Sequence, residues 1–234
     1  SALQLNATTV DGAFTVGVSS GAQAALVLNS GSLVSAAAVD FGTNRGRVVG
    51  GGLSGSEVSA SIRGSGGLVV EGLQPITLSG NNLFTGGLSI SGSVLVPSDA
   101  ALGAGSVALG SGSSVASLTL TGDLTTTKAL SLESVWGVDV RVSANRSAVW
   151  NGAVSGSAAV TKRDAGVLEL GGANTFTGTL TVAQGIVRAA SNNALGNVAS
   201  GTSIPIGAAL EISDGVVLAA EPLGVTGSGV AGGG

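Results

Sequence analysis

The sequence predicts an all-β solenoid, in which short parallel strands stack as successive coils around one continuous core. Glycine, valine, threonine and serine are abundant, and these poor helix formers occur with no apolar stripe at helical spacing. Short segments instead alternate apolar and polar residues, as strands with one buried face do. One motif also recurs along the chain. Such recurrence favours parallel coils stacked in register over a sandwich, which does not need it.

The repeated motif links two distant parts of the chain. Its copies lie within residues 77–93 and 168–185 and share the letters N-x-F-T-G. Asn174 and Asn82 are 92 positions apart, and the same offset relates the other shared residues. Two of only four phenylalanines fall on equivalent positions, which argues against chance. The repeated positions are Asn82, Phe84, Thr85 and Gly86 in the first copy, and Asn174, Phe176, Thr177 and Gly178 in the second.

Each repeated residue type suits a task in a stack of coils. The asparagines are expected at coil corners, where side-chain amides bond to backbone groups that a turn leaves free. The threonines can serve the same purpose, and the glycines permit the tight φ that follows. The phenylalanines are expected to fill the widest part of the core. The alternative for the same letters is a surface hairpin.

In chain order, residues 1–60 hold short apolar segments bounded by glycine, each of a length that suits a strand. These segments are 14–18, 25–28, 31–34 and 38–41. Alternating triplets predict further strands at 88–90, 118–120, 130–132, 168–170, 180–182 and 210–212. The longest alternating segment is 138–142, which places three valines on one face and Asp139 and Arg141 on the other.

The correspondence between the copies extends beyond the motif and sets the scale of the coils. Residues 101–103 and 194–196 both read Ala-Leu-Gly, at an offset of 93. If one coil takes roughly 20 to 25 residues, the repeat is about four coils and the chain is roughly ten. At about 4.8 Å per stacked strand, the rod is roughly 50 Å long. The prediction is one continuous solenoid over 1–234, with divergent coils at 1–61, a first repeat unit at 62–159, and a second at 160–234 that ends in a flexible glycine-rich segment.

Composition excludes several classes of protein. Only 9% of residues are charged, yet the longest apolar run, 33–39, is broken by Ser35 and is far shorter than the roughly 20 residues of a spanning helix. We therefore expect no membrane span in these residues. The net charge of −4 argues against nucleic-acid binding, and the absence of cysteine and histidine removes thiolate metal sites and the commonest general base. No metal or cofactor is expected.

Residues 148–162 and 166–178 resemble the autotransporter-associated β-strand repeat of bacterial passenger domains. That pattern runs W-x-G-x-I-S-G, then T-K, then G-x-L-x-L-x-G-x-N-T-Y-T-G. Here Phe176 replaces the usual tyrosine, and Arg163-Asp164-Ala165 departs from the usual link. The upstream copy is more divergent, because Leu83 replaces the threonine and the tryptophan lead-in is absent. The match covers roughly 60% of the chain and is strong in the second copy.

This resemblance implies a right-handed, single-stranded parallel β-helix that is secreted and exposed at a bacterial cell surface or in extracellular matrix. It implies no catalytic activity, because the repeat is a structural element linked to export.

An enzyme is the first rival interpretation, because extracellular β-helices include enzymes that cleave polysaccharides with clustered carboxylates. One candidate cluster is Asp139 and Arg141 with Glu133, and another is Lys162-Arg163-Asp164 at a predicted turn. The simpler interpretation of both is a solvated strand face or turn. No carboxylate pair occurs in both copies, and Glu169 and Glu211 stand isolated. Catalysis is therefore not expected.

Two further residue types are candidate ligand sites. The glycine runs 50–52 and 64–67 lack the Gly-Lys-Ser/Thr ending of a phosphate-binding loop, and no helix follows them. Exposed tryptophans can stack on sugars. Trp150 lies in the family-like lead-in and is expected to be buried, whereas Trp136, beside Gly137, could be buried or exposed.

The expected function is a non-enzymatic surface or extracellular protein acting in adhesion, aggregation or matrix building. Its partners are expected to be copies of itself, neighbouring coils of a longer chain, or a glycan or host-surface ligand. Neither end shows an obvious cap, since 1–5 already reads as a strand with Leu3 and Leu5 on one face, and 232–234 are glycines. Two explanations stay open: a piece of a longer passenger, or a subunit that stacks head to tail into a filament.

Overall fold

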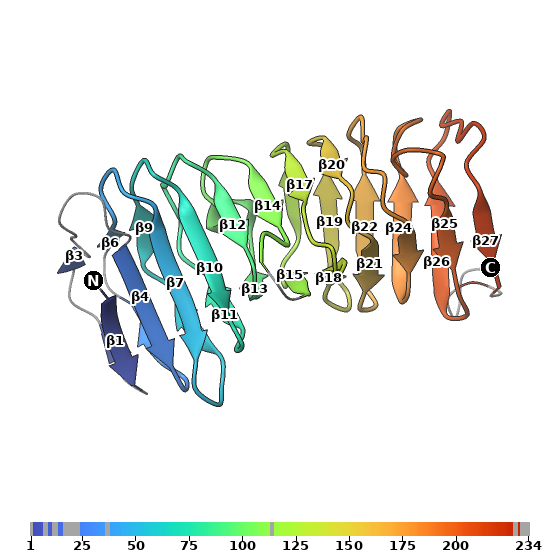
Figure 1. The fold of residues 1–234 in the computed structure, drawn as a ribbon. Helices are drawn as coiled ribbons and strands as arrows, with labels where there is room; N and C mark the ends of the chain where they lie inside the picture. Colours follow the sequence, from blue (N-terminus) through green and yellow to red (C-terminus); the bar gives the residue numbers. More distant parts are fainter. Residues whose placement is uncertain are drawn as a thin grey trace.

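The computed structural model describes residues 2–6, 9–10, 14–15, 24–35, 38–112, 115–226 and 229. These residues form a parallel β-solenoid in which short strands lie side by side along one rod, from the N-terminal to the C-terminal end (Figure 1). Strands pair in parallel from β1 with β4 to β25 with β27. The predicted all-β, parallel solenoid is confirmed.

Each turn of the solenoid passes through three faces. Face 1 is an eight-stranded sheet of β1 (Ala2–Asn6), β4 (Ala24–Asn29), β7 (Gly46–Gly51), β10 (Leu68–Gly72), β12 (Leu88–Ile90), β14 (Val107–Leu109), β17 (Leu130–Leu132) and β20 (Val154–Gly156). Face 2 is an eleven-stranded sheet of β2 (Thr9–Val10), β5 (Leu33–Val34), β8 (Ser56–Val58), β11 (Ile76–Leu78), β13 (Ser93–Val96), β15 (Ala116–Leu120), β18 (Val138–Val142), β21 (Val160–Arg163), β23 (Leu180–Val182), β25 (Thr202–Ile204) and β27 (Leu223–Val225). With about 4.8 Å between stacked strands, face 2 spans roughly 50 Å.

Face 3 consists of two separate sheets. The first holds β3 (Phe14–Thr15), β6 (Ala38–Asp40) and β9 (Ser61–Arg63), and the second holds β16 (Leu124–Thr126), β19 (Ser147–Trp150), β22 (Val167–Leu170), β24 (Gly185–Ala189) and β26 (Ala208–Ile212). Between them the chain is not regular strand. The first N-x-F-T-G segment stacks on β9, and the 3-10 helix Asp99–Leu102 follows in the next turn.

The two copies of the motif lie on different faces. The first follows β11 directly and continues face 3, since the N–H of Leu83 donates to the carbonyl of Ile62 at 2.8 Å. The second follows β22 and continues face 1, since the N–H of Thr175 donates to the carbonyl of Val154 at 2.8 Å. Between them face 2 advances four steps, from β11 through β13, β15 and β18 to β21. The 92-residue offset, predicted as about four coils, is therefore four turns plus one face.

The core is a set of apolar ladders with one residue from each turn. In β18 the residues Val138, Val140 and Val142 are buried while Asp139 and Arg141 face outward, as the alternation predicts. Register stacks Leu118 on Val140, and this ladder continues along face 2. Each predicted triplet falls within a strand. The side chains of Leu3 and Leu5 and the residues 232–234 lie outside the described part of the chain.

Candidate functional site

Asn82 is buried, and its side chain joins three successive turns. Its Oδ1 accepts the backbone N–H of Ile62 from the preceding turn at 2.9 Å. Its Nδ2 donates to the carbonyl of Ala101 in the following turn at 2.7 Å. The segment around Asn82 is not a regular strand, so the amide satisfies backbone groups that a strand ladder would otherwise pair.

Asn174 repeats this arrangement on the other face. Its Oδ1 accepts the N–H of Val154 at 2.8 Å, and its Nδ2 donates to the carbonyl of Ala194 at 2.7 Å. The sequence predicted that both asparagines lie at coil corners and bond to backbone groups that a turn leaves free. The expected bonding of these amides to backbone groups is seen; both side chains are buried, and their partners lie about twenty residues away because adjacent turns supply them.

The phenylalanines of the motif lie in the core, where Phe84 is 1% exposed and Phe176 is 2% exposed. Each ring packs against the glycine of an Ala-Leu-Gly segment in the next turn. A Cβ added to Gly103 would overlap the ring of Phe84, and one added to Gly196 would meet the ring of Phe176. The two motifs that recur in the sequence are therefore the two sides of one contact.

The repeated glycines act by close approach. Gly86 and Gly178 were expected to permit a tight φ, but neither is among the glycines with positive φ. A Cβ at Gly178 would overlap the carbonyl oxygen of Ala158 in the neighbouring turn, and one at Gly86 would overlap the backbone nitrogen of Gly67. Only a residue without a side chain lets these turns stack so closely.

The repeated threonines contribute less than the other motif residues. Thr85 and Thr177 are both exposed. The hydroxyl of Thr177 lies 3.5 Å from the carbonyl oxygen of Gly156, at the limit of a hydrogen bond.

Most of the charged residues that the sequence offered as a catalytic cluster are paired between turns. Asp139 and Arg141 do share the outer face of β18, yet each is paired with the next turn. Arg163 Nε donates to Asp139 Oδ2 at 2.8 Å, and Arg141 Nη2 donates to Asp164 Oδ1 at 2.7 Å. Glu133 accepts a hydrogen bond from the Ser131 hydroxyl at 2.9 Å. Asp139 and Asp164 therefore serve contacts along the solenoid, whereas the hydrogen bond of Glu133 stays within one turn.

Glu169 and Glu211, which the sequence suggested were isolated, are joined by Arg188. The three residues are in register on β22, β24 and β26. Arg188 contacts Glu169 at 3.2 Å and Glu211 at 2.8 Å, so negative, positive and negative charges alternate along face 3. The hydrogen bonds to both carboxylates raise the pKa of Arg188 above its already high value. A spacing of 19 and 23 residues between opposite charges is the sequence signal for this ladder.

Lys162 lies inside the solenoid. The sequence placed it at a solvated turn, but it belongs to β21 and stands in the core ladder between Val140 and Val182. Its Nζ donates to the carbonyls of Asp164 at 2.6 Å and Gln184 at 2.9 Å. Burial lowers the pKa of Lys162 to about 8, and the nearby Asp164 carboxylate opposes that change only in part.

Burial of this amine predicts an unusual dependence of stability on pH. The pKa of Lys162 is about 8 in the folded chain and 10.5 as the reference value, so between these pH values the unfolded chain binds more protons. The free energy of unfolding should therefore rise as pH increases from about 8 to 10.5, by up to about 3 kcal/mol. Urea unfolding at a series of pH values measures this rise, and the chain has no tyrosine or cysteine to titrate in the same window.

The Lys162→Met variant should lose this rise, because methionine fills the core without a titratable group. Lys128→Met, at the other lysine of the chain, should retain it. A wild-type stability that stays level or falls from pH 8 to 10 would contradict the assignment.

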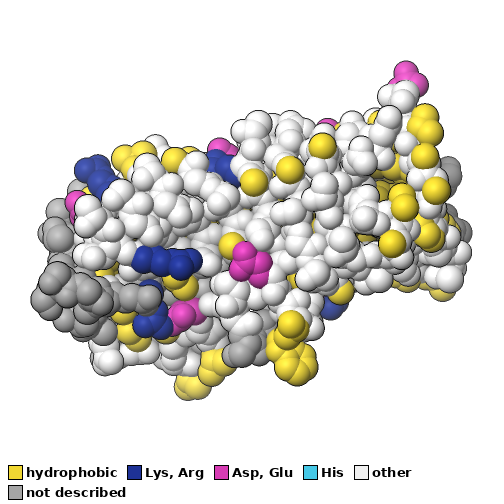
Figure 2. Space-filling model, turned by 45° about the horizontal axis from the view of Figure 1, so that its top comes forward, with side chains coloured by type: hydrophobic (Ala, Val, Ile, Leu, Met, Phe, Trp, Pro, Cys, Tyr) yellow, Lys and Arg dark blue, Asp and Glu magenta, His cyan; other side chains and the backbone are white. Residues whose placement is uncertain are grey.

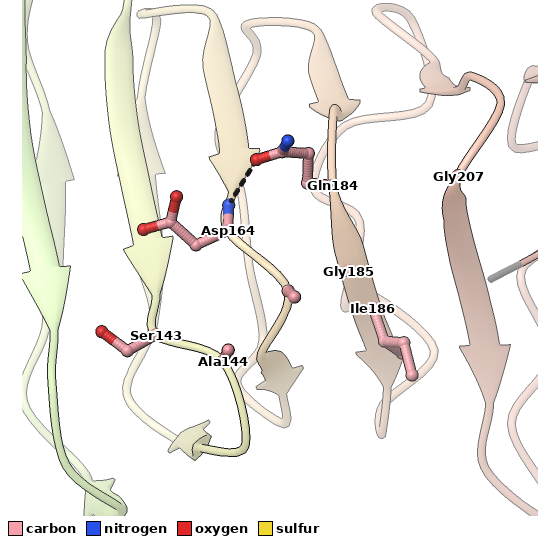
Figure 3. A pocket seen from close by; sticks show the side chains of 8 residues that line it. Ser143, Ala144, Asp164, Gln184, Gly185, Ile186 and Gly207 are labelled. Carbon is pink, nitrogen blue, oxygen red and sulfur yellow. Dashed lines mark hydrogen bonds between the residues drawn. The ribbon is translucent and has the colours of Figure 1, made fainter. Parts of the chain in front are cut away.

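A groove of about 710 Å³ runs along the corner between faces 2 and 3 (Figure 3). Successive turns line it with Ser143 and Ala144, then Asp164 and Ala165, then Gln184, Gly185 and Ile186, and finally Gly207. The turns have a common shape, since Asn145, Asp164, Gly185 and Gly207 all have φ between 61° and 84°. Asparagine, aspartate and glycine are the residues that tolerate this conformation best.

The polar groups of the groove differ in how far they are already bonded. The Asp164 carboxylate is held by Arg141, and its backbone N–H donates to Oε1 of Gln184 at 3.2 Å (Figure 3). Within the described residues, the Ser143 hydroxyl and the Gln184 Nε2 have no protein partner. Sequence reasoning missed this groove. Its signal is a polar residue followed by a small one, which recurs every 20 or 21 positions at 143, 164 and 184.

A second surface feature is the corner between faces 1 and 2, which we call the apolar corner. Exposed large apolar side chains lie there in several turns: Leu53, Leu73, Val115, Val135, Trp136 and Val198. Figure 2 shows hydrophobic side chains protruding from the lower edge of the rod, with few charges around them. Trp136 is 66% exposed, whereas Trp150 is buried, as expected, and its Nε1 donates to the Lys128 carbonyl.

The described residues show neither a metal-binding cluster nor a membrane-spanning helix. They contain no group of three or more acidic side chains arranged to hold a metal ion. No helix in this part of the chain has the length and apolar character that a membrane span requires.

Comparison with known proteins identifies the repeat. The passenger-associated transport repeat matches residues 76–96 and 160–189, which include both N-x-F-T-G segments. The chain is also 31% identical over 134 residues to the adhesin BmaC autotransporter of Brucella suis biovar 1 (strain 1330). That alignment covers 56% of this chain and 4% of the adhesin. No solved structure gives a significant match.

The matched segments contain Asn82 and Asn174, whose side chains bridge neighbouring turns and which we call the asparagine clamps, together with the buried phenylalanines. The similarity therefore falls on residues that join the turns. It implies a protein that is secreted or exposed at the cell surface. The resemblance drawn from the sequence is confirmed: this chain carries the passenger repeat of bacterial autotransporters.

Proposed function

We propose that this chain is a non-enzymatic segment of a bacterial surface protein, and that it acts in adhesion as a rigid, ligand-presenting rod. The observation that carries the proposal is the transport repeat together with the similarity to an autotransporter adhesin. The aligned part is a small fraction of that adhesin, so its role reaches this chain only by inference.

The distribution of polar groups supports a rod. The asparagine clamps, the Arg188 ladder and the pairs formed by Asp139 and Arg141 all connect neighbouring turns. Bonds of this kind resist bending and separation of turns. They also occupy the carboxylates that a polysaccharide-cleaving enzyme would need free.

The outer surface supports adhesion or self-association. The apolar corner exposes Leu53, Leu73 and Val135 almost fully. Exposed apolar side chains that gather in one place mark interaction surfaces, whereas singly scattered ones are ordinary. With only 9% charged residues, little repulsion opposes a close approach by another uncharged surface. The partner is either a host-surface ligand or a second copy of the chain, which in the filament alternative stacks head to tail.

The test attaches the purified chain to fluorescent beads and counts the beads bound to cultured animal cells. Albumin-coated beads are the control, and free chain is added as competitor. We expect attachment above the control that free chain suppresses. Beads that clump together without attaching would support self-association in place of cell adhesion. Beads that neither attach nor clump would contradict both.

The non-enzymatic part of the proposal is tested separately with a panel of soluble polysaccharides. We expect no release of reducing ends on incubation with the chain. Release that disappears in the Asp139→Asn variant would show that the charged face of β18 is catalytic.

A further inference from the structure

We propose that the groove between faces 2 and 3 binds a linear, uncharged glycan that lies along the axis of the solenoid. This inference rests on the proposed adhesive function and names a ligand class and a site for it. It is carried by the arrangement of the lining residues, by their charge and by their spacing.

The groove has two parallel rails of different chemistry. The polar rail consists of the Ser143 hydroxyl, the Asp164 carboxylate and the Gln184 amide, one from each of three successive turns. The second rail consists of Ala144, Ala165 and Ile186 from the same turns. A sugar ring has hydroxyl groups around its rim and apolar C–H groups on its faces, so it can meet both rails at once. Binding sites generally combine apolar lining with a few placed polar groups in this way.

The charges of the groove favour an uncharged ligand. The carboxylate of Asp164 receives two hydrogen bonds from Arg141, at 3.0 and 2.7 Å, which compensates its charge. The Lys162 ammonium beneath is bonded to backbone carbonyls of Asp164 and Gln184 and is buried. What the groove offers to a ligand is a hydroxyl, an amide donor and the remaining acceptor capacity of one carboxylate, which are the groups that bind hydroxyls.

The spacing of the turns favours a sugar chain over a peptide. Stacked strands lie about 4.8 Å apart, close to the advance per residue of an extended, β-linked sugar chain, whereas an extended peptide advances only about 3.3 Å per residue. A glycan along the axis would therefore present one ring to each turn, in register with both rails. The groove spans four turns and about 710 Å³, which is room for a short oligosaccharide.

The test is calorimetric titration of the whole chain with cellohexaose, laminarihexaose and chitohexaose. A heparin-derived hexasaccharide and an extended Ser-Ala peptide serve as the charged and peptide probes. Ala165→Arg and Ala144→Arg each fill the groove from an exposed position, and Ala159→Arg places the same side chain on the corner between faces 1 and 2. Circular dichroism checks that each variant folds. If one groove variant fails to fold, the other still tests the groove.

We expect at least one neutral hexasaccharide to bind, with affinity about tenfold weaker or lost in the groove variants and unchanged in Ala159→Arg. Binding that is equal in all variants, or confined to heparin or the peptide, would overturn the inference. If no neutral sugar binds while coated beads still attach to cells, the glycan site is wrong and the adhesive function stands. If a neutral sugar binds in the groove but the beads do not attach to cells, the glycan site stands and the adhesive function is wrong.

Discussion

Replacing Phe176 with alanine should lower the free energy of unfolding by about 3–5 kcal/mol. The ring is 2% exposed and packs against Gly196 of the next turn, so its removal leaves a hole between two turns. The core beside it already holds an apolar cavity of about 30 Å³ lined in part by Trp150 and Leu180. Stacked strands above and below limit how far the site can collapse, which favours the upper part of this range.

Urea unfolding followed by far-UV circular dichroism measures this loss. Asp139→Ala is the control, because it removes an outward side chain paired with Arg163 and should cost no more than about 1 kcal/mol. A Phe176→Ala variant as stable as Asp139→Ala would show that the ring does not occupy the core.

Replacing Asn82 with leucine should cost about 2–6 kcal/mol, although the two side chains are similar in size. The change leaves the N–H of Ile62 and the carbonyl of Ala101 without their side-chain partner inside the solenoid. Each buried group that loses its hydrogen bond costs about 1–3 kcal/mol, and the two costs fall on different turns. The region around the first motif should therefore open more readily than the rest of the chain.

Asn81→Leu provides a matched control, since the same substitution one residue earlier affects an exposed side chain. We expect its stability to stay within about 0.5 kcal/mol of wild type. Hydrogen exchange supplies a local readout: the Ile62 amide should exchange faster in Asn82→Leu and normally in Asn81→Leu. Unchanged exchange in Asn82→Leu would show that the side chain does not hold that amide.

Together these two changes test one unit of structure. The motif N-x-F-T-G provides an inward amide, an inward ring and a glycine without a side chain, and the Ala-Leu-Gly segment of the next turn receives the first two. The unit works equally on face 3 and on face 1, because its contacts are to the turns before and after it. It depends little on which face it occupies.

The fold class was predictable because its signals are local. Alternation over three to five residues sets which side chains of a strand face the core, and the segment 138–142 shows this in full. The positions of Phe84 and Phe176 in the core and the burial of Trp150 were equally predictable, because large apolar side chains in a repeat are most stable in the shared core.

Pairing between turns was not predictable, because it depends on the length of each turn. Partners in the ion pairs are 19 to 29 residues apart, so no single offset identifies them. For this reason Glu169 and Glu211 looked isolated although Arg188 joins them. Lys162 looked solvated for a related reason: its neighbours Arg163 and Asp164 are charged, but strand alternation turns Lys162 alone into the core.

By itself, therefore, the sequence determined that the chain is a repeat-built β-solenoid, since alternation, glycine content and the recurring motif are properties of short segments, and its motif showed the resemblance to the autotransporter passenger repeat. The tertiary structure alone decided that the motif copies lie on different faces, that Gly86 and Gly178 act by close approach, and that Ser143, Asp164 and Gln184 line one groove. These features arise from the superposition of turns. The superposition depends on the number of residues in each turn of the solenoid, and no single segment contains that information.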